Sequence, residues 1–120
     1  MESRQTQSYK DLIVWQKSMD VVTVIYELTS GFPGHEQYGL TSQMRRAAVS
    51  IPSNIAEGYR RKGSGDYNRF LCIAFGSTSE VETQLFIAVR LHYIKEAQVG
   101  IAVGLLEEVS KMLNRMTTTR

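Results

Sequence analysis

Basic side chains are the residues of this chain whose types and spacing best suit a chemical role. Residues 40–70 contain six of them but only two acidic residues, Glu57 and Asp66, so this stretch has a local net charge of +4. The six are Arg45, Arg46, Arg60, Arg61, Lys62 and Arg69. Cations at this density can bind the phosphates of nucleic acid, and Tyr59 and Tyr67 would add stacking surfaces for unpaired bases.

The same cations also have a structural interpretation. Arg60, Arg61 and Lys62 lie where the second predicted helix ends, and cations there offset the negative end of the helix dipole by roughly a few tenths of a kcal/mol each. Arg45 and Arg46 could instead hold acidic groups of a neighbouring helix. The sequence therefore leaves open which basic residues bind and which are structural.

A second set of polar residues follows one side of the third predicted helix. Ser77, Glu80 and Gln84 form a row beside an apolar one. Glu82 lies two residues from Glu80 and points elsewhere, so the two carboxylates are not a catalytic pair. A candidate structural network between the second and third helices comprises Asn54, Ser77, Glu80, Glu82 and Gln84. In this network Glu80 and Gln84 could contact Arg45, Arg46 or Asn54 on the second helix. The alternative is a solvated surface.

Residue clusters typical of enzymes and metal sites do not occur in the sequence. His35 and His92 stand alone, without the Glu-x-x-His pattern of di-iron bundles. Cys72 has no histidine at a helical neighbour position, so we expect a small buried hydrophobe rather than a nucleophile. Gly63 and Gly65 lack the strand and lysine of a phosphate-binding loop and predict a helix–helix turn. We therefore expect no catalytic residue, no metal and no cofactor.

The composition is that of one ordinary globular domain. The 120 residues are 42% hydrophobic and 22% charged, and the net charge of +2 is too small to indicate nucleic acid by itself. A chain of this length can bury a core without disulfides or metals. Since no stretch approaches the roughly 20 apolar residues of a membrane span and no secretory signal pattern occurs, we expect a single domain over 1–120, with no membrane partner, in the reducing cytoplasm.

Four stretches with apolar residues at helical spacing must position these polar groups. The predicted helices cover about 11–30, 36–62, 65–92 and 96–117. The spacing continues across Pro52, which predicts a kink and not a stop. Small side chains predict a close helix crossing at Ala74, Gly76 and Ser77. Four helices of similar length joined by short turns predict an all-α fold, an antiparallel up-down-up-down four-helix bundle.

Three stretches together resemble the four-helix-bundle family first known from open reading frames in bacterial 23S rRNA intervening sequences. They are DLIVWQKSMDVVTVIYELT (11–29), YGLTSQMRRAAVSIPSNIAEGYRRK (38–62) and RFLCIAFGSTSEVETQLFIA (69–88). The second is the most specific, and the resemblance spans nearly the whole chain, although the last helix matches mostly by its apolar pattern. Val81 stands between two glutamates where many relatives have Leu, which keeps an aliphatic side chain.

The resemblance implies a left-handed antiparallel bundle, and relatives are described as homopentamers with a central channel. It implies no enzymatic reaction. The family is also similar in fold and assembly to the accessory protein of diversity-generating retroelements, a basic pentameric bundle that binds a reverse transcriptase and nucleic acid. A shared fold does not by itself imply a shared function, so this similarity is only weak support for nucleic-acid binding by the basic segment.

Two hypotheses for the function follow. The first is a non-enzymatic, ring-forming interaction protein that binds RNA or DNA through the six basic residues. The alternative is an oligomeric scaffold for protein partners, favoured by the two apolar rows of residues 11–29, which exceed what one bundle core uses. The first hypothesis needs the basic groups to converge on one face, whereas the second needs them neutralised by Glu107, Glu108 and their neighbours.

Overall fold

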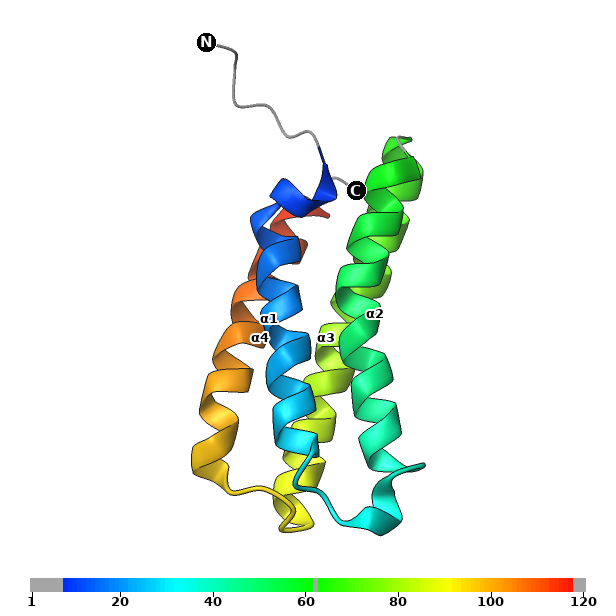
Figure 1. Cartoon of the computed structure of the whole chain (residues 1–120). Helices are drawn as coiled ribbons and strands as arrows, with labels where there is room; N and C mark the ends of the chain where they lie inside the picture. Colours follow the sequence, from blue (N-terminus) through cyan, green and yellow to red (C-terminus); the bar gives the residue numbers. More distant parts are fainter. Residues whose placement is uncertain (1–7, 62, 118–120) are drawn as a thin grey trace.

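Four helices pack side by side in the computed structural model, which describes residues 8–61 and 63–117 (Figure 1). They are α1 (Ile13–Thr29), α2 (Leu40–Arg61), α3 (Ser64–Arg90) and α4 (Glu96–Met116), with short 3-10 turns η1 (Tyr9–Asp11) and η2 (Gly34–Glu36). Each helix contacts the next along the chain, and α1 also contacts α4. The predicted all-α, up-down four-helix bundle is therefore confirmed.

Two helices begin later than the sequence predicts. The chain forms η1 before α1, and η2 before α2, so α2 begins at Leu40 and not at residue 36. The carboxylate of Glu36 fixes this start, because its Oε1 accepts a hydrogen bond from the backbone N–H of Leu40 at 2.9 Å. The first amides of a helix have no partner within the helix, so an acceptor at this position stabilises the end.

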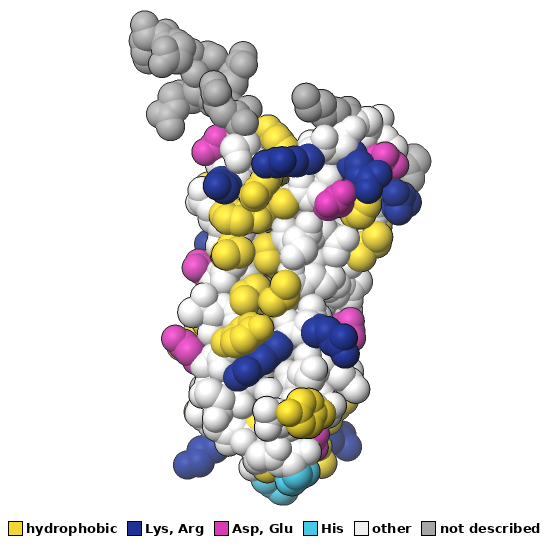
Figure 2. Space-filling view, turned by 45° about the vertical axis from the view of Figure 1, so that its right-hand side comes forward, with side chains coloured by type: hydrophobic (Ala, Val, Ile, Leu, Met, Phe, Trp, Pro, Cys, Tyr) yellow, Lys and Arg dark blue, Asp and Glu magenta, His cyan; other side chains and the backbone are white. Residues whose placement is uncertain are grey.

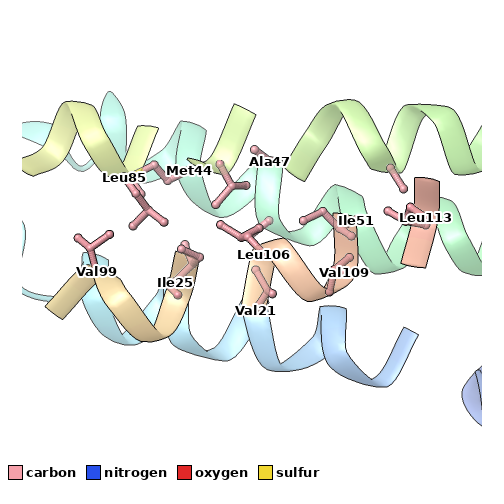
Figure 3. Close-up of a cluster of buried hydrophobic side chains, with 14 of the residues drawn as sticks. Val21, Ile25, Met44, Ala47, Ile51, Leu85, Val99, Leu106, Val109 and Leu113 are labelled. Atoms are coloured by element: carbon pink, nitrogen blue, oxygen red, sulfur yellow. The ribbon is translucent and has the colours of Figure 1, made fainter. Parts of the chain in front are cut away.

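The hydrophobic core runs along the bundle and receives side chains from every helix (Figure 3). Those labelled there are Val21 and Ile25 of α1, Met44, Ala47 and Ile51 of α2, Leu85 of α3, and Val99, Leu106, Val109 and Leu113 of α4. Full burial of such side chains contributes about 1.5–3 kcal/mol each. Since each apolar row is covered by the others, the four helices stabilise one another.

Helix α2 continues through Pro52, as the sequence predicts. Proline removes one backbone donor and would weaken an isolated helix. Here Pro52 is buried, and Ile51 and Ile55 beside it are fully buried. Core packing on both sides of Pro52 therefore holds the helix together.

The glycine at which α2 and α3 approach each other closely is Gly58 and not Gly76. A Cβ atom on Gly58 would lie 2.8 Å from Cβ of Phe70 and 3.3 Å from the carbonyl oxygen of Tyr67. A Cβ on Gly76 would meet nothing within 4 Å, so the predicted role of Gly76 is wrong. The other two residues of that prediction, Ala74 and Ser77, are buried.

Candidate nucleic-acid interface

The structure divides the predicted basic residues into two groups. Arg45 and Arg46 lie in the first half of α2, whereas Arg60 and Arg61 lie at its end, about 22 Å further along the helix axis. Arg69 lies in the second turn of α3, next to that end. Lys62 lies outside the described residues. Figure 2 shows Lys and Arg side chains toward both ends of the face that α1 and α2 form, without a continuous basic patch between them.

Arg60, Arg61 and Arg69, here called the turn cluster, surround the junction of α2 and α3. Arg61 donates from Nε to Oε2 of Glu57 at 3.1 Å, and its Nη1 lies 4.0 Å from Oδ2 of Asp66. Arg69 reaches Oδ1 of the same aspartate at 3.6 Å. All these side chains are about half exposed, so the ion pairs contribute little to stability and can exchange for other anions.

Aromatic rings lie under the guanidinium groups of the turn cluster. Arg61 and Arg69 both lie over the ring of Phe70, at 5.1 and 4.6 Å from its centroid. Arg60 lies 5.5 Å from the ring centroid of Tyr9 in η1. These cation–π contacts fasten the charged groups to the protein surface, while the side chains of Arg61 and Arg69 stay about half exposed.

The two tyrosines predicted as stacking surfaces contact each other beside the turn cluster. Tyr59 and Tyr67 meet edge to face with ring centroids 6.1 Å apart. Burial, followed by the repulsion from Tyr59, raises the pKa of Tyr67. Both side chains are only partly exposed, which limits the ring surface that a ligand can reach.

Arg45 has a structural position between α1 and α2. Its Nε donates to Oγ1 of Thr29 at 2.8 Å, and its Nη2 donates to the carbonyl oxygen of Tyr26 at 3.4 Å. Its guanidinium also lies 4.4 Å from the ring centroid of Tyr26. A cation at the C-terminal end of a helix offsets the helix dipole, so Arg45 fastens the end of α1 to α2.

A groove between α1 and α2 runs from this arginine toward η1, and we call it the α1–α2 groove. Its wider part encloses about 620 Å³ and is lined by Tyr26, Gln37, Tyr38, Thr41, Ser42, Arg45, Arg46, Val49 and Ser50. Its narrower part encloses about 300 Å³ and is lined by Tyr9, Trp15, Met19, Val22, Val49, Pro52, Ser53 and Ala56. Arg46 is exposed at the rim and has no ion pair within the described ranges. Figure 2 shows a strip of hydrophobic side chains along this face, with basic side chains above and below the strip.

The polar network between α2 and α3 is smaller than the sequence predicts. Ser50 joins the helices, because its hydroxyl is 2.9 Å from that of Ser77 and also accepts from Nδ2 of Asn54 at 2.9 Å. Asn54 donates further to the carbonyl oxygen of Ser50 at 2.8 Å. Asn54 and Ser77 are thus brought together through Ser50, which the sequence analysis missed although it lies four residues before Asn54.

The other members of the predicted network lie elsewhere. Glu80 is exposed and Glu82 is half-buried, and neither forms an ion pair with the part of the chain that the structure describes. Gln84 is buried, and its Oε1 has no hydrogen-bond partner among the described residues. The predicted contacts from these residues to Arg45 are absent there, because Arg45 is turned toward α1.

Another polar cluster that the sequence analysis missed joins two loops at the opposite end of the bundle. Tyr93 donates to Oε2 of Glu36 at 2.8 Å, and its hydroxyl lies 3.3 Å from Nε2 of His35. The hydrogen bond from Leu40 N–H, followed by that from Tyr93 and the proximity of His35, lowers the pKa of Glu36. The hydrogen bond to the carboxylate raises the pKa of Tyr93. No local pattern signals this cluster, because its partners are nearly 60 residues apart.

Chemical centres of other kinds are scarce in the described part of the chain. It holds no group of three or more His, Cys, Asp or Glu side chains placed to bind a metal ion. Cys72 is exposed, which corrects the expectation of a buried side chain. No helix within the described ranges combines the length and apolar character needed to cross a bilayer.

Comparison with known proteins places the chain in a family. Residues 10–115 match the family model described as 23S rRNA-intervening sequence protein. The chain belongs to this family. Among proteins with curated descriptions, none matches it.

A solved structure supports the fold of this 23S rRNA-intervening sequence family member. The chain is similar to a protein of unknown function from the S23 ribosomal protein family of Bacteroides thetaiotaomicron, with a TM-score of 0.79 and 24% identity. The similarity covers 89% of this chain and 100% of that one. At this identity the similarity shows that the two proteins share the bundle fold. The role of each surface has to be inferred from the residues of this chain.

Proposed function

We propose that this chain is a non-enzymatic, ring-forming interaction protein of the cytoplasm that holds RNA or other nucleic acid on the turn cluster. The observation that carries the proposal is the density of cations at one end of the bundle. Three guanidinium groups there face two carboxylates, Glu57 and Asp66, and Lys62 adds a fourth positive charge in sequence. This local excess of cations favours phosphate groups over neutral ligands.

The aromatic contacts of the turn cluster favour single-stranded or structured RNA in particular. The guanidinium groups of Arg60 and Arg69 lie over the rings of Tyr9 and Phe70 and belong to exposed side chains. Arginines in this arrangement can contact phosphates and stack on unpaired bases. One copy supplies few phosphate contacts, so a ring such as the homopentamer implied by the family resemblance would strengthen binding through multivalency.

A titration of a mixed-sequence RNA hairpin by fluorescence anisotropy, repeated from about 50 to 200 mM salt, tests this proposal. We expect saturable binding that weakens with salt. Changing Arg60, Arg61 and Lys62 together to Ala should lower the slope of log K against log salt by about 2–3. A matched variant with Arg90, Lys95 and Lys111 changed to Ala should keep the slope. An unchanged slope in the first variant, or equal losses in both, would contradict the assignment of the turn cluster.

A scaffold for protein partners is the second candidate, and exposed apolar side chains favour it. Phe86 is 49% exposed, Ile101 72% and Tyr38 90%. Glu57 and Asp66 partly neutralise the turn cluster, rather than the predicted Glu107 and Glu108, of which Glu108 pairs with Lys17 at 3.0 Å. Absence of RNA binding at the lowest salt would favour this candidate.

A further inference from the structure

We infer that the two loops at the end of the bundle away from the turn cluster bind a divalent transition-metal ion, and that Cu²⁺ suits the geometry best. The ligands are Nε2 of His35, Oε2 of Glu36 and the phenol oxygen of Tyr93, here called the loop triad. His35 and Glu36 belong to η2, and Tyr93 lies between α3 and α4. The inference is independent of the proposed function, because the turn cluster lies at the other end of the molecule (Figure 1).

Only the fold brings the three donor atoms together. In the sequence His35 and His92 stand alone, and the described part of the chain holds no group of three His, Cys, Asp or Glu side chains. The third donor is instead a tyrosine, which lies 57 residues after Glu36. The expectation of no metal from the sequence did not consider this tyrosine.

The distances within the loop triad suit a metal ion. The phenol oxygen of Tyr93 lies 2.8 Å from Oε2 of Glu36 and 3.3 Å from Nε2 of His35, and the last two atoms are 3.9 Å apart. A triangle with these sides has its centre about 2.0 Å from all three atoms, and bonds from such metals to nitrogen and oxygen are about 2.0–2.2 Å long. An ion at this centre would therefore lie within bonding distance of all three ligands.

The same distances favour a planar arrangement of ligands over a tetrahedral one. With bonds of about 2.0 Å, the ligands of a square-planar ion are about 2.8 Å apart when adjacent and about 4.0 Å apart when opposite, whereas those of a tetrahedral ion are all about 3.3 Å apart. His35 and Glu36 have the spacing of an opposite pair, and Tyr93 and Glu36 that of an adjacent pair. Nitrogen and oxygen ligands in a plane are typical of Cu²⁺, which also binds such ligands more tightly than the other divalent first-row metals do.

Contacts with the surrounding loops hold two of the ligands in place. Oε1 of Glu36 accepts the hydrogen bond from Leu40 N–H at 2.9 Å, which leaves Oε2 for the ion. A Cβ atom on Gly39 would lie 2.6 Å from the same Oε1, so the glycine leaves room for the carboxylate. The ring of Tyr93 packs against Phe32 with 5.3 Å between centroids. Ligands that are fixed before the ion arrives lose little freedom when it binds.

Charge and access also suit a cation. The side chain of Glu36 is only 20% exposed, and its one ion pair within the described ranges is with His35. A carboxylate with little access to water and without a lysine or arginine partner would be stabilised by a bound cation. The side chain of His35 is 73% exposed, so an ion can reach the loop triad from solvent. Figure 2 shows histidine on the surface at the lower end of the molecule.

Binding of the ion displaces the phenol proton of Tyr93. Without the ion, this O–H donates to Oε2 of Glu36, and the hydrogen bond raises the pKa of Tyr93. When the ion binds, a bond forms between the metal and the phenolate oxygen, the O–H bond breaks, and the proton passes to water. The charge of the ion offsets the cost of forming the phenolate beside the carboxylate. Each bound ion should therefore release one proton.

A titration with Cu²⁺ in the presence of glycine, a weak competing chelator, tests the inference. We expect one tightly bound ion per chain, a visible absorption band from charge transfer between phenolate and copper, and one released proton, measured by calorimetry in two buffers. Tyr93→Phe should abolish the band, and both Tyr93→Phe and His35→Ala should lower the affinity at least about tenfold. The matched controls are Tyr38→Phe and His92→Ala, which change exposed residues outside the loop triad and should keep the band and the affinity.

Three results would overturn the inference: no absorption band, equal affinity in Tyr93→Phe and the unmodified protein, or binding of Zn²⁺ as tight as that of Cu²⁺. Circular dichroism establishes that each variant keeps its helices. Because Tyr93→Phe also loses a hydrogen bond between the loops, the change of Tm on adding Cu²⁺ gives a second readout. The ion should raise Tm of the unmodified protein and not that of Tyr93→Phe, and equal rises would count against the inference. None of these measurements involves RNA, so their failure would leave the proposed function standing.

Discussion

His92 adopts a left-handed backbone conformation, with φ of 63°, directly after the end of α3. The N–H of Tyr93 closes the helix end by donating to the carbonyl oxygen of Ala88 at 2.9 Å. Glycine normally occupies this position, because any other L residue is strained there. We predict that His92→Gly stabilises the fold by about 0.5–1 kcal/mol and raises Tm by roughly 2–5 °C in thermal unfolding.

The control for this prediction is His92→Ala, which removes the imidazole but keeps a Cβ. Because the strain comes from the Cβ and not from the ring, the alanine variant should not gain the stability of the glycine variant. If both variants gained equally, the imidazole itself and not the backbone would be the source of the strain.

The carboxylate of Glu36 should make the stability of the protein depend on pH. Its pKa is lowered in the folded state, so the unfolded chain binds the proton more readily, and the stabilisation is present above the usual pKa of a glutamate and is lost as the pH falls through the lowered value. We predict that Glu36→Gln lowers Tm at about pH 7 and that the gap to the unmodified protein closes toward about pH 3. A gap that stays constant over this range would mean that the charge of Glu36 does not contribute.

The packing of helix α2 against helix α3 depends on Gly58. Alanine is the better helix former, but its Cβ would lie 2.8 Å from Cβ of Phe70, so the helices would have to move apart. We predict that Gly58→Ala lowers the free energy of unfolding by about 1–2 kcal/mol in urea titration. Gly104→Ala is the matched control, since its Cβ would meet nothing within 4 Å, and it should raise stability by about 0.5–1 kcal/mol.

The attachment of α1 to α2 depends on Arg45. Its two hydrogen bonds hold the carbonyl end of α1, so Arg45→Ala should lower the free energy of unfolding by about 1–2 kcal/mol. Arg46 is the next residue, and its exposed side chain lacks an ion pair in the described ranges, so Arg46→Ala should change stability by less than about 0.5 kcal/mol. Equal losses in the two variants, measured by urea unfolding, would contradict this division of roles.

Assembly of several copies would change the stability of the whole molecule. If copies associate into the ring of the proposed function, folding is coupled to association and Tm rises with protein concentration. We predict such a rise for the unmodified protein over a hundredfold concentration range. A constant Tm over that range would agree only with a monomer.

The sequence by itself determined the number, order and approximate limits of the helices, and with them the up-down bundle. Helical spacing of apolar residues is a local property of the sequence, and the spacing continues across Pro52. The helix continues there because buried neighbours on both sides stabilise it. The sequence also predicted that Asn54 and Ser77 lie between α2 and α3. Ser50, which joins them, lies one turn before Asn54, and its place opposite Ser77 depends on how α2 packs against α3.

The tertiary structure alone decided which polar groups meet. Arg45 turns toward Thr29 and away from α3, Glu36 contacts Tyr93, and Cys72 faces solvent. These outcomes depend on how far each helix is rotated about its axis and shifted along its neighbour. The packing of all four helices together fixes that rotation and shift, and no single stretch of sequence contains them.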